Sequence, residues 1–199
     1  MYMGLKDCKA YCLNKRRDYD TALHSFSTKD KRQVLTADET EIRLIRPEEY
    51  PLLKEFLYDA IYLPEGAAAP PREIINQPEL AAYITDFGQP DDLCMVAEAY
   101  GNILGAAWTR ILAGKVKGYG NVDDYTPEFA ISVKKEFRQQ GIGSKLMQEM
   151  IVLLKNRGYE KVSLSVNKDN YAYRMYQKLG FHVLREQDED YLMVLALQE

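Results

Sequence analysis

The sequence predicts an α/β protein built on one mixed sheet, and three observations lead to that prediction. A strand, a helix and a strand follow one another over residues 129–166, an order that makes the two strands parallel. The dipeptide Gly101-Asn102 joins two apolar runs and predicts an antiparallel hairpin. Two further strands, at 181–185 and 191–197, close the chain. We therefore expect a mostly antiparallel central sheet with one parallel pair and flanking helices.

The composition is that of one globular domain of ordinary size. The 199 residues are 46% hydrophobic and 28% charged, which is too apolar for a disordered chain. The 26 Lys and Arg against 30 Asp and Glu give 26 − 30 = −4, and this acidic balance argues against a nucleic-acid partner. We see no signal peptide and no apolar run near the roughly 20 residues of a membrane span. A cytoplasmic protein with no membrane partner is predicted.

Residues 1–40 differ in charge from residues 41–199 and are predicted to be an N-terminal extension of the domain. They hold eight Lys or Arg and six Asp or Glu, so their net charge is 8 − 6 = +2, and the remainder carries −4 − 2 = −6. Cys8 and Cys12 stand near His24, but their spacing matches no zinc pattern. Together with Cys94 they are expected to be reduced thiols, and no metal site is predicted.

The elements before the parallel pair follow from apolar periodicity and from proline and glycine. Pro47 ends a short strand and suits the first turn of the helix that follows. In chain order we predict a strand at 42–46, a helix at 47–61, a loop at 63–72, a helix at 79–87, hairpin strands at 93–100 and 103–112, and a polar, glycine-bearing connection at 114–125.

The elements after this connection are more strongly patterned. Phe129, Ile131 and Val133 alternate with small residues, which is typical of a strand. The remaining elements are a helix at 141–157 that stops at Gly158, a strand at 162–166, a helix at 172–179 closed by Gly180, and the two last strands.

The turn between the first parallel strand and its helix carries the first chemical signal, Arg138-Gln-Gln-Gly141-Ile-Gly143. Free N–H groups at a helix start attract anions, most naturally a pyrophosphate, and glycines let the backbone approach it. The dinucleotide fingerprint fails because Leu146 stands where its third glycine belongs, and no Gly-Lys-Ser/Thr completes a Walker A loop. A glycine turn without a ligand is the alternative.

This turn matches the Arg/Gln-x-x-Gly-x-Gly/Ala motif of the GNAT superfamily of N-acetyltransferases. Downstream, the stretch Leu164-Ser-Val-Asn167 to Leu179-Gly180-Phe181, with Asn170, Ala172 and Tyr176 between, resembles the family's second signature. The resemblance covers about residues 41–197. It implies a fold in which the parallel strands 129–133 and 162–166 splay apart around the pantetheine arm of acetyl-CoA.

The resemblance also implies a reaction, in which acetyl-CoA is the cosubstrate and a primary amine of a small molecule or peptide attacks it directly. The main chain of two strand residues would bind pantetheine, amides across 138–144 would hold the pyrophosphate, and an asparagine would contact the thiol arm. The cofactor-binding residues implied are Ile131, Val133, Arg138, Gln139, Gln140, Gly141, Ile142, Gly143, Ser144 and Asn170.

Two catalytic roles follow from the resemblance and from the chemistry of amine acylation. Tyr176 stands where the family places the acid that protonates the leaving thiolate, although its apolar helix stripe also suits a structural tyrosine. Glu128 is the candidate base for the ammonium proton, with Asp123 and Asp124 as rivals. His182 is expected to be structural.

The acceptor is not encoded in any motif. The acidic residues around 123–128 and the group Asp86, Asp91 and Asp92 suit a cationic acceptor, and a solvated acidic face is the alternative. By resemblance, the proline-rich loop 64–71 would form an acceptor wall, and a homodimer is compatible with the family. The alternative function is a non-catalytic acyl-CoA sensor or interaction module of the same fold.

Overall fold

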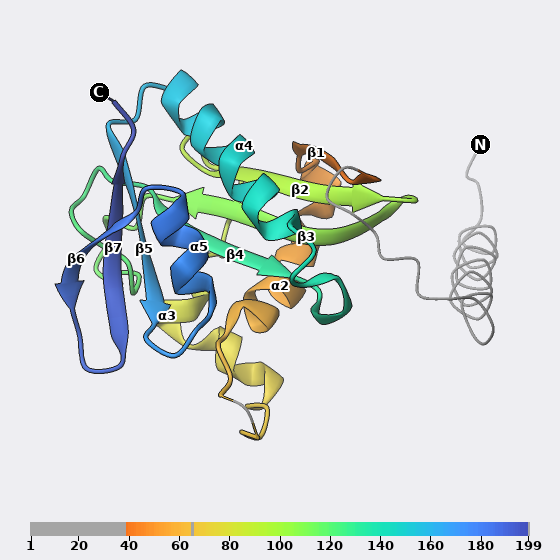
Figure 1. Ribbon diagram of the computed structural model, residues 1–199, viewed down its shortest axis with the longest axis horizontal. Coiled ribbons are helices and arrows are strands. Elements are labelled where there is room, and N and C mark those ends of the chain that lie inside the picture. Colours follow the sequence, from red (N-terminus) through yellow and green to blue (C-terminus); the bar gives the residue numbers. More distant parts are fainter. Residues whose placement is uncertain (1–38, 65, 199) are drawn as a thin grey trace, which may run out of the picture. The chain divides into compact units, whose positions relative to one another are not determined.

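The computed structural model describes residues 39–64 and 66–198, which form one sheet with helices on both faces (Figure 1). The strands are β1 (Glu41–Leu44), β2 (Leu93–Ala99), β3 (Asn102–Arg110), β4 (Glu128–Val133), β5 (Lys161–Asn167), β6 (His182–Glu186) and β7 (Asp190–Ala196). Their order across the sheet is β1-β2-β3-β4-β5-β7-β6, and only β4 and β5 are parallel neighbours. The predicted mixed, mostly antiparallel sheet is confirmed.

The parallel pair β4–β5 separates almost as soon as it forms. β4 pairs with β3 from Arg110↔Glu128 to Gly105↔Val133, along its whole length. It pairs with β5 at Glu128↔Ser163 alone, next to a hydrogen bond from the Ser163 amide to the Pro127 carbonyl (3.0 Å). Beyond this point the two strands diverge, so the splayed pair is also confirmed.

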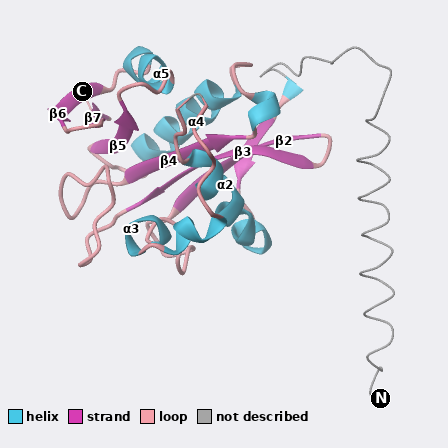
Figure 2. Cartoon of the chain, turned by 90° about the horizontal axis from the view of Figure 1, so that it is seen from below, coloured by secondary structure: helices cyan, strands magenta, loops and turns pink. Residues whose placement is uncertain are grey.

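Helices cover the sheet on both sides (Figure 2). Successive side chains of a strand point to opposite faces, so each strand contributes to two cores. One core packs under α4 (Ile142–Asn156) and α5 (Ala172–Lys178) and includes Phe129 of β4. The other packs under α2 (Leu53–Ala60) and around α3 (Pro78–Ala81), where Trp108 of β3 is fully buried.

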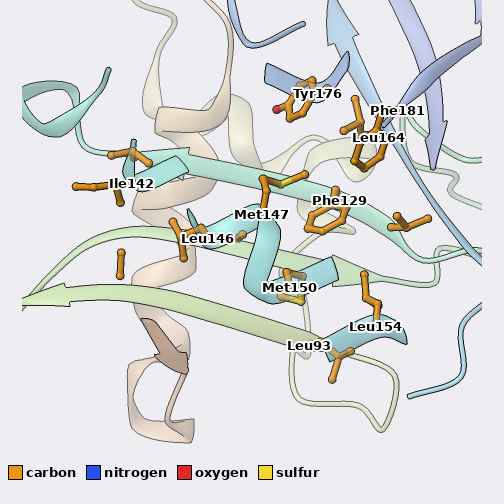
Figure 3. Packing of buried hydrophobic residues seen from close by; sticks show 14 of the residues in the cluster. Leu93, Phe129, Ile142, Leu146, Met147, Met150, Leu154, Leu164, Tyr176 and Phe181 are labelled. Atoms are coloured by element: carbon orange, nitrogen blue, oxygen red, sulfur yellow. The ribbon is translucent and has the colours of Figure 1, made fainter. Parts of the chain in front are cut away.

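The helix α4 anchors the first core and fixes the end of the β4–β5 opening. Leu146, Met150 and Leu154 recur every four residues and are completely buried against the sheet (Figure 3). Burying one such side chain contributes roughly 1.5–3 kcal/mol. The N-terminus of α4 is therefore held firmly beside the end of β4.

Two predicted helices differ from the observed ones. The helix predicted at 47–61 begins as a 3-10 helix, η2 (Pro47–Leu52), because Pro51 has no N–H to donate to an α-helical bond. The helix predicted at 79–87 is wrong beyond Ala81, where α3 ends. The carbonyls of Ala82 and Thr85 accept hydrogen bonds from Arg110 of β3 instead, and residues 82–86 form turns.

The other boundaries agree with the predictions within one or two residues. The predicted loop 63–72 ends in the 3-10 helix η3 (Arg72–Asn76), and η4 (Lys135–Phe137) follows β4. None of the helices in 39–64 and 66–198 is long and apolar enough to cross a membrane. The predicted extension 1–40, with Cys8, Cys12 and His24, lies outside the described residues except for its last two positions.

Candidate active site

The opening between β4 and β5 exposes main-chain groups that a regular sheet would pair. The Lys134 amide donates to the Leu104 carbonyl of β3, whereas the Pro127 carbonyl faces β5. Because main-chain groups alternate along a strand, those of Ile131 and Val133 face β5. The described part of β5 pairs with neither residue. Main-chain donors and acceptors of β4 therefore line the opening.

The turn from β4 into α4 has the conformation that its glycines predict. Gly141 caps the helix with φ +84°, and Gln139 is left-handed at φ +61°. No side chain caps the first turn, so the N–H groups of Ile142, Gly143 and Ser144 are not satisfied by a capping group. Together with the helix dipole, these amides form a site suited to an anion.

Gly143 leaves a bare surface beside this turn. A Cβ there would meet Met175, Val133 and Ile131 at 3.7–3.9 Å, which is ordinary contact. The packing of the protein does not require glycine at this position, so the missing side chain leaves room next to the opening. This space and the free amides fit a thin pantetheine arm that ends in a pyrophosphate.

The side chain of Arg138 is used within the protein. Its Nε donates to the Val133 carbonyl (2.8 Å), and its terminal nitrogen donates to the Asp59 carbonyl at the end of α2 (2.9 Å). Gln140 similarly donates to Glu136 (3.1 Å). These bonds shape the turn and tie it to α2, so the predicted anion contacts of 138–140 are left to main-chain amides.

Tyr176 lies in the core on the α5 side of the opening, with its ring 5.9 Å from that of Phe181 (Figure 3). It is 7% exposed, and burial raises the pKa of its hydroxyl. Within the described chain this hydroxyl has no hydrogen-bond partner. Its neighbours differ: Tyr171 is exposed, and Tyr173 stacks on Tyr191. Asn170 accepts a hydrogen bond from the Ala172 amide (2.9 Å) and so orders the start of α5.

Glu128 lies on the opposite face of the sheet, at the point where β4 and β5 separate. It is 2% exposed, and burial raises its pKa from 4.5 to about 7. Its Oε1 accepts hydrogen bonds from the Tyr83 hydroxyl and from the Gly120 amide (2.6 Å). Its Oε2 is buried and has no partner in the described structure. A carboxyl with such a pKa exchanges protons near neutral pH.

The two rival carboxylates are engaged in the connection before β4. Asp123 accepts from the Tyr125 and Thr126 amides and pairs with Lys161 (2.7 Å). This ion pair and the hydrogen bonds hold its pKa well below the usual range. Asp124 is exposed and pairs with Lys117 (2.5 Å). Asp123 therefore stays ionised at neutral pH, unlike Glu128, and Asp124 is engaged by Lys117.

In the other predicted acidic group, Asp86, Asp91 and Asp92, two of the three carboxylates are committed to contacts within the domain. Asp92 pairs with Arg110 (2.8 Å), and Asp91 accepts from the Tyr159 hydroxyl (2.7 Å). These contacts weaken the expectation of an acidic face for a cationic acceptor. His182 is exposed on the edge strand β6, and no group of His, Cys, Asp or Glu in 39–64 and 66–198 could hold a metal ion.

Sequence reasoning missed the shell around Glu128. Tyr83 precedes Glu128 by 45 residues and was expected on a helix, and its burial at 6% exposure comes from tertiary packing. Gly118 and Gly120 were expected only as parts of a polar, glycine-bearing connection. A Cβ on Gly118 would meet Oε2 of Glu128 at 2.2 Å, and one on Gly120 would meet its Cγ at 2.9 Å. The sequence did offer one signal for this contact. Gly118 and Gly120 lie in the loop just before a strand whose first residue is Glu128.

A splayed parallel pair, an uncapped glycine turn, and a buried tyrosine and a buried carboxyl on the two faces beside the opening are the features of an acyl-CoA-dependent transferase. The sequence profile of the acetyltransferase (GNAT) family matches residues 55–181, nearly two thirds of the chain. The protein belongs to this family, as its two motifs predicted.

Several known proteins resemble this chain. N-alpha-acetyltransferase 30 of Schizosaccharomyces pombe is 40% identical over 52 residues, which are 26% of this chain and about a third (35%) of that relative. The Escherichia coli ribosomal-protein-S18-alanine N-acetyltransferase superimposes with a TM-score of 0.56 at 18% identity, over 80% of this chain and 95% of that one. The Thermoplasma acidophilum paia N-acetyltransferase, solved with coenzyme A, superimposes with a TM-score of 0.57 at 22% identity. The match covers 79% of this chain and 98% of that one.

Proposed function

We propose that this protein is an acetyl-CoA-dependent N-acetyltransferase that moves an acetyl group to a primary amine of a small molecule or peptide. The observation that carries the proposal is the β4–β5 opening with a buried tyrosine on one face and a near-neutral carboxyl on the other. The family match and a structural neighbour solved with coenzyme A support it.

Acetyl-CoA, when bound, supplies the acetyl group as a thioester. The first-turn amides of α4 would hold its pyrophosphate, and the main chain of Ile131 and Val133 would hold the pantetheine arm in the opening. The N–H of Val133 also suits the oxyanion that forms at the thioester carbonyl. The Val133 carbonyl accepts from Arg138, so the N–H is the main-chain group of Val133 that stays available to the opening.

Two protons leave the acceptor nitrogen in the proposed reaction. Glu128 takes one from the acceptor ammonium, directly or through a water, and the neutral amine then attacks the thioester carbonyl. The new C–N bond forms as the C–S bond breaks, the thiolate takes a proton from Tyr176, and the second amine proton leaves the acylated nitrogen and restores the Tyr176 hydroxyl. Burial keeps Tyr176 protonated until this step. The products are the N-acetylated amine and coenzyme A.

The pKa of Glu128, compared with the pKa values of possible acceptor amines, favours one kind of acceptor. The ammonium of a peptide N-terminus has a pKa of about 7.7–8.0, against about 10.4 for a lysine side chain. A base whose pKa is about 7 lies much closer to the first value. The similarity to N-alpha-acetyltransferase 30 points the same way. Peptide α-amines are therefore the first acceptors to test, followed by lysine peptides, polyamines and aminoglycosides.

Thiol release from acetyl-CoA across this amine panel tests the proposal. We expect release that depends on the acceptor and yields an acetylated product one acetyl group heavier by mass spectrometry. The matched control is the full chain with Gly143→Trp, which fills the space beside the opening and should abolish acetyl-CoA binding in calorimetry. Acetyl-CoA binding without turnover of any amine would instead favour the non-catalytic acyl-CoA sensor.

A further inference from the structure

The two oxygens of the Glu128 carboxylate have different surroundings. Oε1 accepts two hydrogen bonds, from the Tyr83 hydroxyl and the Gly120 amide, whereas buried Oε2 accepts none from the described residues. A carboxylate oxygen that already accepts two bonds is a poor proton acceptor. The free lone pairs on Oε2 therefore make it the more basic oxygen of the pair.

Tyr83 is held so that its proton points at Glu128. A tyrosine hydroxyl donates one hydrogen bond and also accepts. The Tyr119 amide donates to the Tyr83 oxygen (2.9 Å), and an amide N–H cannot accept in return. The only proton of the hydroxyl is thus directed to Oε1. Trp108 fixes the backbone of the same residue by donating to the Tyr83 carbonyl (3.1 Å).

Residues 118–120, which we call the strap, complete this arrangement. The strap lies on the carboxylate because Gly118 and Gly120 carry no side chain there, and a Cβ on Gly120 would also meet the main chain of Leu164 in β5 at 2.9 Å. The strap supplies one amide to Glu128 and one to Tyr83. Tyr83, the strap and Glu128 therefore form one hydrogen-bonded unit.

We propose that Tyr83 is a positioning residue for acetyl transfer, which holds Oε1 of Glu128 and leaves Oε2 as the oxygen that takes up the proton. This inference rests on the proposed function. It assigns Tyr83 no contact with substrate, because its hydroxyl is used on both sides by the protein. Its effect on the reaction passes through the carboxylate alone.

The hydrogen bond from Tyr83 also adjusts the affinity of Glu128 for protons. Burial raises the pKa of Glu128 to about 7, and the bonds from Tyr83 and Gly120 oppose that rise. Tyr83 is the titratable group that contacts this carboxylate within the described chain. The strap offers main-chain groups, and β5 places Ser163 in register with Glu128. Loss of the Tyr83 hydroxyl therefore raises the pKa of Glu128 further.

The test is Tyr83→Phe in the full chain, with Tyr159→Phe as the matched control. Tyr159 also donates to a carboxylate, that of Asp91, whereas the hydrogen bonds of Glu128 within the described residues come from Tyr83 and Gly120. We expect Tyr83→Phe to lower kcat about tenfold and to move the acidic limb of the kcat/KM profile up by about one pH unit, a typical loss for a hydrogen bond to a charged group. KM for acetyl-CoA and the profile of Tyr159→Phe should not change. An acidic limb that stays in place in Tyr83→Phe overturns the proposal.

A second measurement does not depend on catalysis or on the phenylalanine variant. The carboxyl stretch of Glu128, isolated as an infrared difference against Glu128→Gln, reports its titration directly. Replacing Tyr83 by 3-fluorotyrosine makes the phenol a stronger donor, so the Glu128 titration should move to lower pH. An unchanged titration would contradict the proposal. Failure of the wild-type protein to acetylate any amine would instead overturn the proposed function, and it leaves this titration readable.

Discussion

The two faces of the sheet differ sharply where β4 and β5 separate. On the α4–α5 face, Tyr176 lies among apolar side chains, and its hydroxyl has no partner within the described residues. On the α2–α3 face, Glu128 is equally buried but is surrounded by donors from Tyr83 and the strap. One buried polar group is thus left without hydrogen bonds, and the other is partly satisfied.

This difference suits the two charge states that the proposed reaction needs. Burial penalises the phenolate, so Tyr176 stays neutral and keeps its proton until a stronger base appears beside it. Donors around Glu128 stabilise its anion, and burial destabilises it, so the two effects bring its pKa to about 7. Because successive side chains of a strand point to opposite faces of the sheet, Glu128 lies on one side of the opening and the apolar core around Tyr176 lies on the other.

The largest effect is expected at Tyr176. Tyr176→Phe keeps the ring packed on Phe181 and removes only the hydroxyl. Loss of a general acid typically lowers the rate between 10² and 10⁴-fold, and we expect kcat to fall about 10³-fold with KM for acetyl-CoA unchanged. Steady-state kinetics on the best acceptor of the panel measures it.

The control for Tyr176→Phe is Tyr173→Phe on the same helix. Tyr173 accepts a hydrogen bond from Gln177 (3.0 Å), and its ring stacks on Tyr191, so this variant tests loss of a hydroxyl from α5 in general. It should retain wild-type kcat. Equal losses in both variants would mean that Tyr176 is a structural tyrosine.

A somewhat smaller loss is expected on the other face. Glu128→Gln keeps the shape of the side chain and an oxygen for Tyr83 and Gly120, but it cannot take a proton. We expect kcat to fall several hundredfold and the acidic limb of the pH profile near pH 7 to disappear. Asp124→Asn removes an exposed carboxylate from the same connection and should change neither quantity. A retained limb in Glu128→Gln would assign the base elsewhere.

The same substitution should change how stability depends on pH. The pKa of Glu128 is higher in the folded protein, about 7, than the ordinary 4.5, so the fold binds this proton more tightly than the unfolded chain does. The free energy of unfolding therefore falls as pH rises from about 4.5 to 7, by about 3 kcal/mol from this group. Denaturant titrations at pH 5 and pH 8 should show this fall in the wild type and not in Glu128→Gln. A parallel pH dependence in the two proteins would mean that Glu128 titrates normally.

The sequence predicted the α4–α5 face better than the α2–α3 face, and the reason is physical. On the first face, apolar spacing along two helices determines which residues are buried, and Tyr176 follows that spacing directly. Its place next to the opening was implied by the family resemblance of the stretch from Leu164 to Phe181. Local patterns were sufficient because each element buries one regular stripe.

The α2–α3 face depends on contacts between distant segments. The helix expected over 79–87 was wrong because Arg110 and Trp108 of β3 bind the carbonyls of 82–85, and a helical pattern does not report such bonds. Gly118 and Gly120 are required by a carboxylate that follows them in the chain by eight or more residues. No periodicity reports that contact, so Tyr83 and the strap emerged only from the folded structure.

The smallest effect is expected at Asp123, the former rival of Glu128. Asp123→Asn keeps an oxygen for the Tyr125 and Thr126 amides but removes the charge that pairs with Lys161. Its pKa is lowered in the fold, so its contribution to stability is present above the ordinary 3.8 and is lost as pH falls through the acid range. The pair is about a third exposed and screened by water, so we expect a loss below about 1 kcal/mol at pH 7. For a domain of this size the melting temperature should fall by roughly 2–4 °C at most at pH 7, by less at pH 3, where the unfolded chain is already largely protonated, and kcat should be unaltered. A fall in kcat like that of Glu128→Gln would move the base from the sheet to the connection and break the contrast between the two faces.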